Sequence, residues 1–79
     1  MFVESVDSTC SQIVNLNTGT GLRLIRSSYT DSHGYYIWRV EVISGGGTVL
    51  LKDADKDTAE KLYNRLKNEW VGNDTTTVV

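Results

Sequence analysis

Segment 35–43 alternates more clearly than any other part of the chain between two kinds of side chain. Successive residues of a β-strand point to opposite faces of a sheet, so this pattern predicts a strand with one buried and one exposed face. The predicted buried face consists of Tyr36, Trp38, Val40 and Val42, and the other face of Tyr35, Ile37, Arg39, Glu41 and Ile43. Because the second face mixes charged with large apolar groups, we expect a partner to bind there.

Shorter runs with strand-like composition lie on both sides of this segment. They are Phe2–Val6, 12–17, 21–28 and 48–52. Glycine-containing connections at 18–20 and 44–47 have the length of hairpin turns. The sequence therefore predicts a four- or five-stranded antiparallel β-meander, the number depending on whether Phe2–Val6 joins the sheet.

From residue 53 the apolar period changes from two to about 3.6 residues, which predicts an amphipathic helix. Its apolar stripe consists of Ala59, Leu62, Tyr63, Leu66 and Trp70. Asp57 and Glu60 are spaced like a capping pair at a helix start. Asp57 and Lys61 are four residues apart, in the favourable order for an ion pair. Gly72 is a typical residue to end the helix.

These elements predict an α+β fold in which one C-terminal helix packs on one face of the antiparallel sheet. The expected core combines Leu22, Leu24, Trp38, Val40, Val49 and Leu51 of the sheet with Ala59, Leu62, Tyr63 and Leu66 of the helix. We expect a single domain over residues 1–72. We expect residues 73–79 to form a flexible C-terminal tail, or an edge strand if something orders them.

The composition excludes several ways of stabilising so small a domain. Among 79 residues there is one cysteine, Cys10, and one histidine, His33, so one chain can form neither a disulfide nor a Cys/His zinc site. A lone cysteine fits a reducing, cytoplasmic setting. The first seven residues lack the pattern of a signal peptide, and no apolar run is long enough to span a membrane.

Two motifs suggest metal or phosphate chemistry but lack required residues. Residues 53–57 read Asp-Ala-Asp-Lys-Asp, the opening of a calcium loop, but Thr58 and Asn64 occupy the positions of its glycine and bidentate glutamate. The three glycines at 45–47 lead into a strand rather than into the Lys-Ser/Thr pair and helix of a phosphate loop. We expect no metal and no cofactor.

Catalysis is also not expected. Cys10, Asp31 and His33 could supply a nucleophile, an acid and a base, but Cys10 and His33 both lie in polar segments that are typical of solvated turns. A domain of this size also offers little volume for a dry active site. We therefore interpret the chain as non-enzymatic.

The leading hypothesis is a small protein-binding module or inhibitor that acts through its exposed sheet face. The expected partner-binding residues are Arg23, Ile25, Tyr35, Ile37, Arg39 and Glu41. In length and type the chain is similar to small modulators encoded by phages and mobile elements, including inhibitors of bacterial defence. Homodimerisation through the same face is one alternative. A single-stranded nucleic-acid-binding sheet is the other, although the net charge of −2 and the presence of Glu41 beside Arg39 make it the weaker one.

Overall fold

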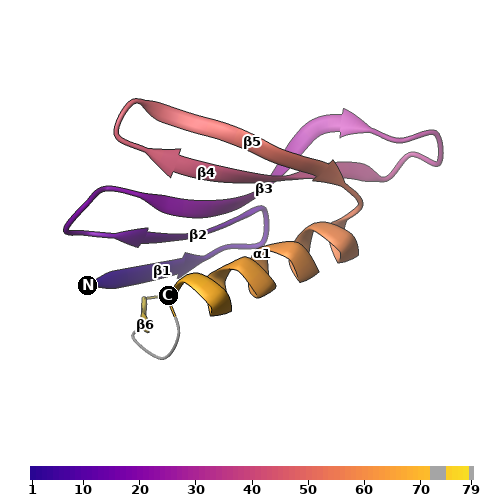
Figure 1. The fold of residues 1–79 in the computed structure, drawn as a ribbon. Coiled ribbons are helices and arrows are strands. Elements are labelled where there is room, and N and C mark those ends of the chain that lie inside the picture. Colours follow the sequence, from indigo (N-terminus) through magenta and orange to yellow (C-terminus); the bar gives the residue numbers. More distant parts are fainter. Residues whose placement is uncertain (72–74, 79) are drawn as a thin grey trace.

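The computed structural model describes residues 1–71 and the backbone of 75–78, with side chains described as far as Trp70. Strands β1 to β5 are consecutive and antiparallel, and α1 follows them (Figure 1). The elements are β1 (Phe2–Val6), β2 (Cys10–Asn15), β3 (Gly21–Thr30), β4 (Tyr36–Ser44), β5 (Gly47–Ala54), α1 (Lys56–Val71) and β6 (Thr75–Val78). The predicted α+β architecture is confirmed, with five antiparallel strands rather than four.

The sheet has the spatial order β5-β4-β3-β2-β1-β6. β6 pairs with β1 in parallel, so it extends the sheet beyond the meander.

The predicted tail at 73–79 is described only at Thr75–Val78, and its flexibility stays a prediction. The expected helix stop at Gly72 lies outside the described residues. Cys10, which was expected in a turn, is the first residue of β2.

The core lies between α1 and the face of the sheet that the helix covers (Figure 1). Its buried residues are Ile13, Leu22, Leu24, Trp38, Val40, Ala59 and Tyr63. Leu62, Leu66 and Val42 pack against this core while remaining partly exposed. Of the residues expected in the core, the sheet-centre and helix members are confirmed, and Ile13 is a member that the sequence pattern did not indicate.

Two strand residues expected in the core are exposed, and so is one on the predicted buried face. Val49 and Leu51 of β5 have exposed fractions of 58% and 49%, and Tyr36 of 46%. The prediction was wrong for Val49 and Leu51 because α1 packs mainly over β3 and β4 and leaves the edge strand β5 largely uncovered. Tyr36 stands at the start of β4, beside a register irregularity between β3 and β4.

The N-terminus of α1 is capped by Asp55, not by Asp57 as the spacing suggested. Asp55 accepts hydrogen bonds from the backbone N–H of Thr58 (3.1 Å) and from its hydroxyl (2.6 Å). These bonds hold the pKa of Asp55 below its ordinary value of 3.8. Asp57 instead pairs with Lys61 one turn later, at 3.0 Å, as predicted.

A buried polar cluster connects β1 to the helix. Glu4 is only 6% exposed, and its Oε2 accepts hydrogen bonds from Tyr63 Oη (3.1 Å) and Lys67 Nζ (2.8 Å). Burial, together with the neighbouring Glu4 carboxylate, raises the pKa of Tyr63, so its phenol stays protonated and keeps donating. This cluster therefore ties the second half of α1 to β1, two elements that are far apart in the sequence.

Candidate functional site

The face of the sheet opposite α1, called the outer face below, follows from strand register. Leu22 and Leu24 are buried beneath the helix, so Arg23 and Ile25 point the other way. Residues paired directly across antiparallel strands share a face, which extends the assignment to the neighbouring strands. The outer face includes Cys10, Gln12, Val14, Arg23, Ile25, Arg39, Glu41, Ile43, Leu50 and Asp53. Within the described chain, α1 is the only helix and it lies on the other side of the sheet.

The charged groups at the centre of the outer face neutralise one another. Arg23 Nε and Nη2 both lie 2.9 Å from Glu41 Oε1, and the side chain of Glu41 is only 11% exposed. Arg39 Nε lies 3.0 Å from Asp53 Oδ1, without the alignment of a hydrogen bond. Two cations and two anions therefore form two pairs, surrounded by aliphatic side chains.

Most of the predicted partner-binding residues lie together on this face. Arg23, Ile25, Arg39 and Glu41 are cross-strand neighbours on β3 and β4. Ile37 is half-buried two residues before Arg39, and its backbone carbonyl accepts a 2.7 Å hydrogen bond from Ser27 Oγ. Alternation along β4 places Ile37 on the same face.

Tyr35 lies apart from this group. It precedes β4, is 72% exposed, and lines a cavity of about 410 Å³ beside the N-terminus of α1. Two aromatic side chains that line this cavity already make cation–π contacts within the chain. The Arg26 guanidinium lies 4.3 Å from the centre of the Tyr36 ring, and Lys56 Nζ lies 5.4 Å from the centre of the Trp38 ring. Asp31 stabilises the turn between β3 and β4. Its Oδ1 accepts hydrogen bonds from the backbone N–H groups of His33 (2.8 Å) and Tyr35 (3.1 Å).

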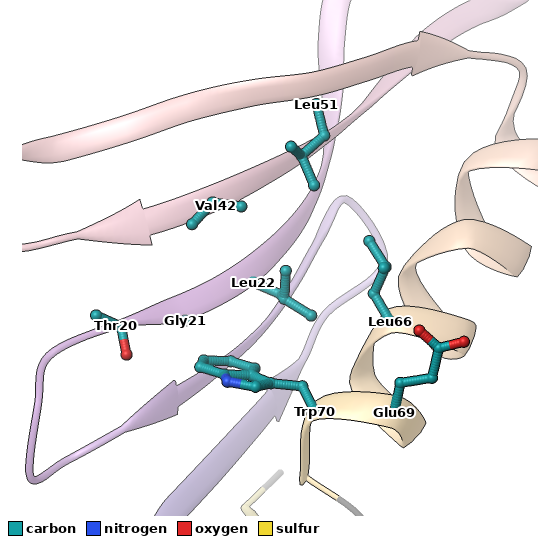
Figure 2. A pocket seen from close by; sticks show the side chains of 8 residues that line it. All are labelled: Thr20, Gly21, Leu22, Val42, Leu51, Leu66, Glu69 and Trp70. Carbon is teal, nitrogen blue, oxygen red and sulfur yellow. The ribbon is translucent and has the colours of Figure 1, made fainter.

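A second surface, called the apolar groove below, opens on the helix side of the sheet (Figure 2). Side chains from the sheet and from the C-terminal half of α1 converge on a cavity of about 510 Å³. Leu22, Val42, Leu51, Leu66 and Trp70 supply its apolar lining, with Thr20, Gly21 and Glu69 completing it. The Trp70 ring is held edge-on to Phe2 of β1, with 5.1 Å between centroids.

Sequence reasoning missed the apolar groove because it assigned Leu51 to the core. A β-bulge produces the observed arrangement: β5 pairs Leu50 with Glu41 and Lys52 with Val40, so Leu51 is an extra residue between them. Leu50 therefore faces outward, and Leu51 faces the groove (Figure 2). The signal in the sequence is the run Val49-Leu50-Leu51, since three consecutive apolar residues cannot all face one side of a regular strand.

The residues considered for catalysis are not brought together in the part of the chain that the structure describes. None of the described contacts joins Cys10 to Asp31 or His33, and burial raises the pKa of the Cys10 thiol above its ordinary value of 9.0. A raised thiol pKa is the reverse of what an activated nucleophile needs. In the part of the chain that the structure describes, no three His, Cys, Asp or Glu residues cluster as metal ligands would.

The acidic run at 53–57 is divided among separate partners. Asp53 pairs with Arg39, Asp55 caps the helix, and Asp57 pairs with Lys61.

No helix among the described residues is long and apolar enough to cross a membrane. No protein-family model matches this chain, and no curated protein or solved structure matches it either.

Proposed function

We propose that this chain is a non-enzymatic protein-binding module that binds a protein partner through the outer face. The observation that carries the proposal is an open sheet face on which aliphatic side chains surround paired charges. Val14, Ile25 and Ile43 are half-buried there, and Leu50 is 45% exposed. Apolar faces of this kind are typical of interaction surfaces.

The charge arrangement indicates the chemistry of the partner. Arg23 is paired with Glu41 and Arg39 with Asp53, so the outer face carries no net charge at its centre. A strongly charged partner surface would have to break these pairs, whereas an apolar, uncharged surface would bury them intact. We therefore propose a partner with a predominantly apolar patch. A small domain that covers such a patch acts by occupying it, which is how a small inhibitor works.

Nucleic acid fits the same face less well. Phosphate binding requires cations that are free to replace counterions, and both outer-face arginines are paired with carboxylates.

The free thiol of Cys10 on this face fits a reducing, cytoplasmic setting for the complex.

Affinity capture from a lysate of the native host, followed by purification of the captured protein, tests the proposal. We expect Leu50→Asp and Ile37→Asp to reduce binding of the purified partner at least about tenfold, since a charge would be buried without a partner. Val49→Asp is the matched control, because Val49 is 58% exposed and pairs with Val42, which lines the apolar groove on the helix side of the sheet. Circular dichroism checks that each variant is folded.

Three results would contradict the proposal. Binding that survives both outer-face substitutions would place the interface elsewhere. A solution mass showing that the chain forms a dimer, which Leu50→Asp dissociates, would make the outer face a self-association surface. Salt-sensitive binding of a single-stranded oligonucleotide that Leu50→Asp abolishes would favour the nucleic-acid alternative.

A further inference from the structure

Large apolar side chains that line the apolar groove are exposed to solvent. Leu51 is 49% exposed and Trp70 41%, on opposite walls of the groove (Figure 2). Its volume of about 510 Å³ lies within the range of cavities that bind small ligands. The groove lies on the opposite side of the sheet from the outer face, so it is a separate surface.

Glu69 gives this groove an electrostatic preference. Among the residues that the structure describes, it is the single charged one that lines the cavity. Glu4, Glu41, Asp53 and Asp57 each have an ion-pair partner. Among the side chains that the structure describes, no ion pair or side-chain hydrogen bond involves Glu69. Because no described cation lies within ion-pair distance of this carboxylate at the edge of an apolar cavity, it favours a ligand that brings a cation to it.

We propose that the apolar groove binds a short segment of a partner protein in which a large apolar side chain stands next to a lysine or arginine. The apolar side chain enters between Leu51 and Trp70 and packs on Leu22 and Leu66. The basic side chain pairs with Glu69 at the rim. This site goes beyond the outer-face function, because it uses different residues on the other side of the sheet.

Two short peptides that differ in one charge test this site: acetyl-Lys-Phe-Leu-amide and acetyl-Glu-Phe-Leu-amide. Binding is followed by the NMR shift of the Trp70 indole N–H, which Trp70→Phe distinguishes from that of buried Trp38. We expect the lysine peptide to bind about threefold to tenfold more tightly than the glutamate peptide, the range for one exposed ion pair gained and one repulsion removed. In Glu69→Gln the two peptides should bind within about twofold of each other, because the charge that discriminates between them is gone.

The adjacent leucines of β5 supply a matched pair of variants. Leu51→Asp should abolish peptide binding, and Leu50→Asp should leave it unchanged, because the two leucines have similar exposure but face opposite sides. The proposal is overturned if both peptides bind wild type equally, or if Leu51→Asp binds normally. It is also overturned if the chain self-associates in a way that Leu51→Asp, but not Leu50→Asp, disrupts, since a second copy would then occupy the groove.

Discussion

Glu4 shows how a single residue can be misjudged when only the local pattern is considered. In the sequence it is one polar residue of a short alternating run, whereas in the fold it is buried against a helix that begins more than fifty residues later. A buried carboxylate is tolerated only when hydrogen bonds replace its hydration, and Tyr63 and Lys67 provide them. Such pairings depend on where the helix lies over the sheet, and short-range periodicity does not encode that.

Tyr63→Phe tests the contribution of this cluster. Removing the hydroxyl deletes one hydrogen bond to a buried charge and leaves the ring packing in place, so we expect the free energy of unfolding to fall by about 1.5–3 kcal/mol. Urea denaturation followed by circular dichroism measures the change. An unchanged midpoint would show that water replaces the hydroxyl at Glu4. Tyr29→Phe is the control, because Tyr29 is 65% exposed.

The Cys10 thiol offers a probe of the outer face. Because burial raises its pKa, less reactive thiolate is present at a given pH than in the unfolded chain. We expect the iodoacetamide labelling rate of the folded protein to reach its half-maximal value at a higher pH than that of the protein in urea. The purified partner should further slow labelling if it covers this face. Coincident pH profiles for folded and unfolded chains would contradict the assignment of Cys10 to a half-buried position.

Among the elements, the helix was predicted well and its cap was not. Spacing identifies the apolar stripe of α1, because the 3.6-residue period requires that those side chains share a face. The run at 53–57 offers three aspartates at two-residue intervals, and any of them is a suitable cap by residue type. The choice of Asp55 depends on where β5 ends, at Ala54, and a strand end is set by pairing with β4.

Substitutions at Asp55 should affect the pH dependence of stability. The native pKa lies below the unfolded value, so the carboxylate stabilises the folded state above about pH 4, and this contribution is lost as pH falls through the native pKa. Asp55→Ala should lower the melting temperature at pH 7. Asp55→Asn should retain most of the cap but lose this part of the acid dependence. Thermal melts between pH 2.5 and 7 test this, and identical acid profiles for wild type and Asp55→Asn would contradict it.

For the whole molecule, chain order allowed the meander to be predicted, because short glycine turns make sequential strands neighbours. The same reasoning placed Arg23, Ile25, Arg39 and Glu41 on one face, since alternation and register suffice for that. It could not place Tyr35, whose direction depends on the turn at Asp31. It also could not predict the apolar groove, because the groove depends on how far one helix extends across a wider sheet.

The bulge in β5 has a consequence for how this protein can vary. Loss of the codon for Leu51 would remove the extra residue, yet Leu50 could still pair with Glu41 and Lys52 with Val40. One in-frame deletion would thus erase a wall of the groove without displacing any neighbouring pair. The two surfaces can therefore be lost separately during evolution. The apolar groove can be lost by deletion of one residue from β5, and the outer face by substitution of its side chains.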